Sequence, residues 1–164
     1  MKALILIGLQ GDFLAGGPMA VPDGDAVIPL AYQLQAAFRL VVATQQWHPA
    51  NHRSFALNHR GRVAGERVRV ARADQILKPT HCVQNTRGAE LSPALMRNHI
   101  NKVMRLGSDQ VVSVNLCQFS RTTFAIICWR MRAVRCPLRH RGEKRHERFL
   151  VVASPKLQKS AITW

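Results

Sequence analysis

Residues 40–52 read LVVATQQWHPANH and combine the pattern of a strand with two histidines. Its first five residues, LVVAT, are mainly apolar and are bounded by polar residues, which is typical of a buried strand. His48 and His52 follow, and Pro49 excludes an ordinary helix interior, so we expect both imidazoles on a structured turn. Open α/β sheets keep their ligands at the carboxyl ends of strands. Neutral imidazoles at such a position suit zinc, iron and related divalent ions.

The chain before this strand supplies a second strand and a helix. Residues 2–9 form a continuous apolar run, as in a parallel strand that is covered on both faces. Val27, Ala31 and Leu34 then recur at helical spacing, which predicts an apolar stripe with Gln35 facing out. A strand, a helix and a strand of these lengths form a right-handed crossover unit of a parallel sheet. The fold class predicted from the pattern is therefore α/β.

The pattern after residue 58 is weaker. Residues 59–75 contain five arginines and no clear period, so we expect a solvated loop. Ser92 and Pro93 have the residue types of a helix start, and residues 100–106 suit a third strand.

A third histidine, His81, follows on a loop that reads PTHCV at residues 79–83. One interpretation is a site built from His48, His52 and His81. The other is three ordinary surface histidines, and the spacing alone does not separate the two.

Several longer sequence motifs occur in order along residues 1–58 and 76–95. They are ALILI (3–7), LQGDF (9–13), AGG (15–17), AVPDGD (20–25), WHPANHRSF (47–55) and HCVQN (81–85). Together they resemble the nicotinamidase (pyrazinamidase) branch of the isochorismatase-like cysteine hydrolases. The resemblance implies a three-layer parallel-sheet α/β fold. It also implies hydrolysis of nicotinamide to nicotinate and ammonia, a step of NAD salvage, with a small amide such as nicotinamide as the partner.

The resemblance also implies a metal site. In the family an aspartate and histidines hold a divalent ion such as zinc, iron or manganese, which anchors the pyridine nitrogen of the substrate. His48, His52 and His81 match the metal-binding histidines, and Gln46 stands at the position of the aspartate. The neutral amide removes a negative charge from the ligand set, so we expect weakened metal binding. Phe13 matches an aromatic residue that would pack on the substrate ring, with a core phenylalanine as the alternative.

The catalytic groups of the family are missing. In the family a cysteine thiolate attacks the amide, an aspartate takes the thiol proton, and a lysine stabilises the charged pair. Gly8 occupies the position of the aspartate, and Leu106 occupies the position of the lysine. No sequence motif like Ala-Thr-Asp-x-Cys-Val, which would contain the nucleophile, is present. Asp12 is expected to cap a turn, and Arg105 to point to the other face of its strand. We therefore expect a pseudoenzyme that is inactive or severely impaired.

The composition divides the chain in two. Residues 1–58 hold three basic and three acidic residues, so the whole net charge of +15 comes from residues 59–164. Gly142 is the only glycine after Gly107, although the tight turns of an α/β half-domain use several. We predict a nicotinamidase-like part at residues 1–107, with a fold that is incomplete beyond it, and a divergent, poorly folded basic tail at residues 108–164. A frame-shifted translation would also explain this tail.

Residues 129–149 offer an alternative function. They are rich in arginine, with Trp129 and Phe149 at the ends, which suits phosphate contacts and base stacking. Binding of nucleic acid or another polyanion is therefore the second hypothesis, and the amide is the favoured partner. No apolar run approaches the roughly 20 residues of a membrane helix, and no signal peptide is recognisable, so we expect a cytoplasmic protein without a membrane partner.

Overall fold

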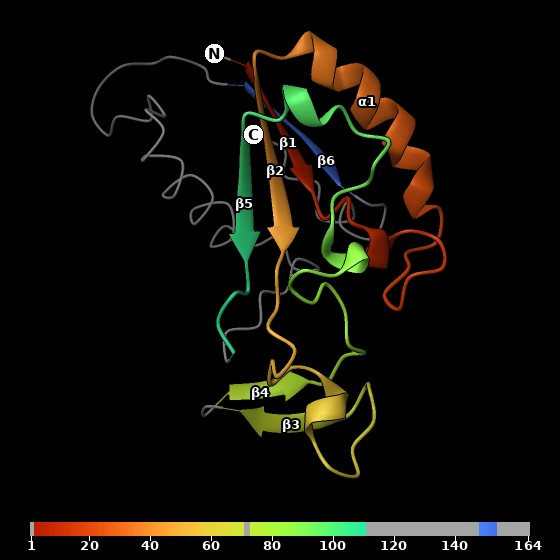
Figure 1. The fold of residues 1–164 in the computed structure, drawn as a ribbon, viewed down its shortest axis with the longest axis vertical. Helices are drawn as coiled ribbons and strands as arrows, with labels where there is room; N and C mark the ends of the chain where they lie inside the picture. Colours follow the sequence, from red (N-terminus) through yellow and green to blue (C-terminus); the bar gives the residue numbers. More distant parts are fainter. Residues whose placement is uncertain (1, 71–72, 111–147, 154–164) are drawn as a thin grey trace, which may run out of the picture.

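The computed structural model describes residues 2–70, 73–110 and 148–153. Its centre is a four-stranded sheet with the strand order β5-β2-β1-β6, drawn in Figure 1. The strands are β1 (Lys2–Ile7), β2 (Leu40–Gln46), β5 (Lys102–Leu106) and β6 (Arg148–Ala153). All three pairings are parallel, which confirms the predicted α/β parallel-sheet class.

Both central strands are buried because their sequences are apolar on both faces. The β1 side chains from Ala3 to Ile7 are at most 2% exposed. The helix α1 (Val27–Ala37) lies along one face of the sheet (Figure 1). Its buried residues Val27, Ile28 and Ala31 pack in one core with alternate side chains of β1 and β2. The crossover unit predicted from residues 2–44 is therefore confirmed.

One detail of α1 was predicted wrongly. Gln35 does not face solvent but is fully buried. Its side-chain Nε2 donates to the Met96 carbonyl at 2.9 Å, and its Oε1 accepts from the Met96 N–H at 3.1 Å. Burial is tolerated because one backbone unit satisfies both ends of the amide.

Two further sequence-based expectations were wrong. Residues 67–70 and 73–76 are not loop but form two antiparallel strands, β3 (Arg67–Val70) and β4 (Ala73–Ile76), which are set apart from the main sheet in Figure 1. The alternation RVRV is the strand signal that the arginine content concealed. Ser92 starts no α-helix, and its hydroxyl accepts from the Ala94 N–H at 3.3 Å in a local turn.

Short 3-10 helices make the remaining turns: η1 (Gly11–Phe13), η2 (Gly24–Ala26), η3 (Ala56–Asn58), η4 (Arg87–Ala89) and η5 (Arg97–His99). No helix in the described part of the chain has the length and apolarity needed to cross a membrane. The domain boundary after residue 107 stays a prediction. The one described strand beyond it, β6, pairs with β1 over the full length of both. Most of residues 129–149 lie outside the described ranges.

Candidate functional site

Two loops at the carboxyl end of β2 bring the histidines together. The His48 N–H donates to the Cys82 carbonyl at 2.9 Å, and the Gln84 N–H donates to the His48 carbonyl at 2.8 Å. A second, similar contact joins Phe55 to Lys78. These strand-like bridges place His81 beside the turn that follows β2.

The three imidazoles form a buried cluster. The exposed fractions of His48, His52 and His81 are 2%, 0% and 2%, so the interpretation as ordinary surface histidines is wrong. The ring centroid of His48 lies 4.6 Å from that of His52 and 5.2 Å from that of His81. The fully buried Phe55 ring packs against all three, with centroid distances of 5.3 to 5.7 Å. Sequence reasoning gave Phe55 no role, although an aromatic residue three positions after His52 was a usable signal.

The side chain of Gln46 lies between two of the imidazoles. Its Oε1 is 3.1 Å from His48 Nε2 and 3.1 Å from His81 Nε2. On the far side of its ring, Nδ1 of His48 lies 2.9 Å from the Gly107 carbonyl oxygen. Nδ1 of His81 lies 2.7 Å from the Pro79 carbonyl oxygen. A carbonyl oxygen only accepts, so Nδ1 of both rings carries the proton. A backbone carbonyl on the far nitrogen is also the usual support of a metal-ligating histidine.

Both of these rings are neutral near pH 7. Burial, with a smaller effect of His52 and then His81, lowers the pKa of His48 to about 3. Burial also lowers the pKa of His81, in opposition to the hydrogen bond from its ring to the Pro79 carbonyl. A neutral ring with a proton on Nδ1 has a bare lone pair on Nε2, so both lone pairs face the end of the Gln46 side chain.

His52 differs from the other two histidines. Its Nδ1 accepts from the Ser54 N–H at 3.2 Å and lies 2.7 Å from the Ser54 hydroxyl. The neutral ring therefore carries its proton on Nε2 and presents no lone pair there. Within the described ranges, no three His, Cys, Asp or Glu side chains are arranged to hold a metal ion. The donor atoms that suit one are two imidazole nitrogens and, when its oxygen faces them, Gln46.

The two positions assigned to catalytic side chains carry no ionisable group. Gly8 follows β1 with φ +63°, a left-handed conformation that favours glycine, and it faces the Phe13 ring. Leu106 is 5% exposed at the end of β5. The next residue, Gly107, lies so close to His48 that an added Cβ would clash with the imidazole ring. The imidazole therefore fills the space beside the end of β5.

A thiol and an acid do lie near His81, but they do not form a nucleophile pair. The Asp12 carboxylate accepts from the backbone N–H of Cys82 at 2.6 Å and so joins two loops that are distant in sequence. The Cys82 side chain is fully buried. Burial and, secondarily, the charge of Asp12 raise the pKa of its thiol, which is the opposite of activation. Asp12 was expected to cap a local turn, but its carboxylate instead binds the backbone N–H of a residue in a distant loop.

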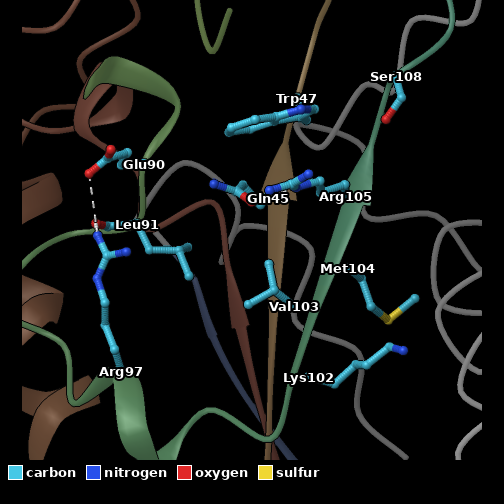
Figure 2. Close-up of a pocket in the computed structure, with 10 residues that line it drawn as sticks. All are labelled: Gln45, Trp47, Glu90, Leu91, Arg97, Lys102, Val103, Met104, Arg105 and Ser108. Atoms are coloured by element: carbon cyan, nitrogen blue, oxygen red, sulfur yellow. Dashed lines mark hydrogen bonds and ion pairs between the residues drawn. The ribbon is translucent and has the colours of Figure 1, made fainter. Parts of the chain in front are cut away.

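A separate groove of about 780 Å³ lies beside β5 (Figure 2). Trp47 lines it, with the Arg105 guanidinium carbon 4.0 Å from the Trp47 ring centroid. No imidazole of the cluster lines this groove. Because Arg105 faces the groove while Leu106 is buried, Arg105 does not replace the missing lysine.

The parallel sheet and the loops at its carboxyl end define the class of the protein, which is an α/β fold of the isochorismatase-like type. The chain is homologous to nicotinamidases. It is 43% identical over 105 residues to the nicotinamidase of Acinetobacter baylyi, covering 64% of this chain and 49% of that protein. It is 42% identical over 115 residues to the nicotinamidase of Escherichia coli, covering 68% and 54%. The chain thus spans about half the length of these relatives. No protein-family model matches it.

Solved structures agree with this homology. A nicotinamidase from Acinetobacter baumanii superposes with a TM-score of 0.63 at 40% identity, over 66% of this chain and 53% of that one. The pyrazinamidase of Pyrococcus horikoshii, solved in complex with zinc, superposes with a TM-score of 0.56 at 31% identity, over 81% and 64%. The predicted nicotinamidase resemblance is therefore confirmed.

Proposed function

We propose that this chain carries the substrate-holding part of a nicotinamidase-like site but lacks amidase activity. The observation that carries the proposal is the buried group of His48, His81 and Gln46 at the carboxyl end of β2. Gly8 and Leu106, at the carboxyl ends of the neighbouring strands β1 and β5, bring no acid and no amine. The ligand is a small pyridine carboxamide such as nicotinamide.

A divalent ion is the expected cofactor, in keeping with the zinc complex of the Pyrococcus horikoshii relative. His48 and His81 would hold it through Nε2, and Gln46 through its side-chain oxygen. His52, the third predicted ligand, would first have to move its proton from Nε2. The bound ion supplies a Lewis acid for the pyridine nitrogen. Since none of these ligands is anionic, the affinity is low.

Phe13 would contact the substrate ring. It is half-buried, and its ring centroid lies 5.9 Å from that of His81 in a tilted arrangement. A planar pyridine packs on such a face by offset or edge contacts. In the bound amide the ring would thus be held by Phe13, while the carboxamide faces the end of β1.

Amide cleavage fails because the groups that form and break bonds are absent from their positions. An amide needs an activated nucleophile and a base that takes its proton. Gly8 has no side chain, Leu106 has no charge, and the Cys82 thiol is buried with a raised pKa. Loss of a catalytic set that acts as a unit removes the reaction path.

The test is an ammonia-release assay with nicotinamide. The purified full-length chain is incubated with nicotinamide and a divalent ion, with the homologous Escherichia coli nicotinamidase as the positive control. We expect no ammonia above the amount formed without protein. Multiple turnovers by this chain, abolished by heat denaturation, would overturn the proposal of inactivity.

Binding is tested separately. Calorimetry should detect weak nicotinamide binding that Phe13→Ala reduces, whereas Phe38→Ala, at the end of α1, should not. An equal loss in both variants would count against the assigned pocket.

The polyanion-binding alternative falls almost wholly on residues outside the described ranges, and no observation of the structure favours it. The cytoplasmic location likewise stays a prediction.

A further inference from the structure

The end of the Gln46 side chain faces two lone pairs in a buried site. The His48 and His81 rings carry their protons on Nδ1, against the carbonyls of Gly107 and Pro79. Their Nε2 atoms are therefore acceptors, and each lies 3.1 Å from one Gln46 oxygen, which is also an acceptor. Gln46 is 3% exposed, so water cannot easily relieve two contacts between acceptors.

A half-turn of the carboxamide removes this conflict. The oxygen and the nitrogen of a glutamine amide have nearly the same shape, so the turn exchanges them without a change in packing. The nitrogen carries two protons, and the site offers it two lone pairs.

We propose that Gln46 turns its NH₂ group toward the cluster and donates one hydrogen bond to His48 Nε2 and one to His81 Nε2. This arrangement, here called the amide latch, lies where the binding site of the proposed function would hold its ion, and in this sense the inference rests on that proposal. The latch joins β2 to the loop of residues 78–84 without metal. An ion binds only after the carboxamide turns back, so latch and ion compete for the same two nitrogens.

The latch explains how a site without a carboxylate stays ordered. An aspartate or glutamate at residue 46 has no donor and needs a cation, or a protonated ring, between itself and the imidazoles. Glutamine supplies both protons itself. The substitution from the aspartate of the family to Gln46 is thus a change from a site that requires an ion to one that is satisfied without it.

The direct test is nuclear magnetic resonance of the full-length chain, labelled with ¹⁵N at histidine and glutamine, at pH 8 with a chelator. We expect His48 and His81 to be protonated at Nδ1 only. We also expect both side-chain protons of Gln46 to exchange slowly and to couple to imidazole nitrogens, and the variant Gln46→Glu assigns these signals by their loss. A proton on Nε2 of either ring, or rapidly exchanging Gln46 amide protons, would overturn the latch.

A second measurement compares Gln46→Glu with the matched control Gln45→Glu. Gln45 is the buried neighbour in β2, but its side chain bonds the Ala89 carbonyl on the opposite face. In chelator, Gln46→Glu should unfold at a lower temperature than the wild type, and Zn²⁺ should restore it. Calorimetry with Zn²⁺ should show affinity higher by on the order of tenfold for Gln46→Glu, with the control unchanged from the wild type. Equal stability of wild type and Gln46→Glu in chelator, or an equal gain in the control, would refute the latch.

These outcomes separate the latch from the proposed function. If the wild type binds one Zn²⁺ tightly through the Gln46 oxygen, the latch is wrong and the metal site stands. If the latch signals are present but no variant binds nicotinamide, the latch stands and the amide-binding proposal fails.

Discussion

Acid should destabilise this protein through its buried histidines at a pH where most carboxylates are still ionised. His48 has a pKa of about 3 in the folded chain, against about 6.5 in an unfolded one. Between these values the unfolded chain binds a proton that the folded chain does not, so the free energy of unfolding falls as the pH falls. The contribution of His48 is fully present above pH 6.5 and is lost progressively below it.

The magnitude follows from the difference in proton binding. One proton corresponds to about 1.4 kcal/mol per pH unit, so lowering the pH from 7 to 5 should cost about 2 kcal/mol for His48 alone. His81 acts in the same direction because burial also lowers its pKa. For a domain with a total stability of about 5–15 kcal/mol, this loss is large.

The assay is urea unfolding followed by tryptophan fluorescence at pH 5, 6, 7 and 8, in chelator. His48→Gln removes the titrating ring and should flatten the pH dependence, whereas His99→Gln, at an exposed position, should leave it unchanged. Stability that is constant or rises from pH 7 to pH 5 would refute the reasoning. So would an equal slope in the wild type and in His48→Gln.

Three further outcomes test individual contacts. Gly107→Ala should lower the free energy of unfolding by about 1–3 kcal/mol more than Gly61→Ala. Both glycines have a positive φ, but only at Gly107 would a Cβ press against His48. Urea unfolding measures the difference, and equal losses would contradict the contact. Asp12→Asn should cost about 1.5–3 kcal/mol by weakening the charged hydrogen bond to the Cys82 N–H, and a loss near zero by the same measurement would show that the cap is dispensable. Cys82 should resist iodoacetamide in the native chain and react in urea, as followed by peptide mass spectrometry, and rapid native alkylation would contradict its burial and raised pKa.

The central strands were predictable because one local property determined each. Residues 2–9 and 40–44 are apolar on both faces, and only the interior of a parallel sheet accommodates that pattern. The burial of Gln35 was not predictable, since its partner Met96 lies far along the chain and leaves no trace in the helical period. The strands β3 and β4 were not predicted because the arginines that alternate with valines in this segment are also typical of a solvated loop.

Some features of the candidate site were likewise predictable from the sequence, and others were not. The sequence motifs around His48, His52 and His81 predicted that the three rings form one site, and the burial of all three rings supports this. The sequence did not predict their proton positions, because these depend on carbonyls of Gly107 and Pro79 that only the folded backbone brings near. The distinct state of His52 depends in the same way on its contact with Ser54.

The pairing of β1 with β6 affects how the chain reaches its fold. Lys2 pairs with Arg148 and Ile7 with Ala153, so β1 is synthesised long before the strand that becomes its neighbour. Until then one hydrogen-bonding edge of β1 has no partner from β6, and closing so long a loop is slow. Nascent chains should therefore depend on chaperones that shield β1, and aggregation should begin from this strand when synthesis stalls.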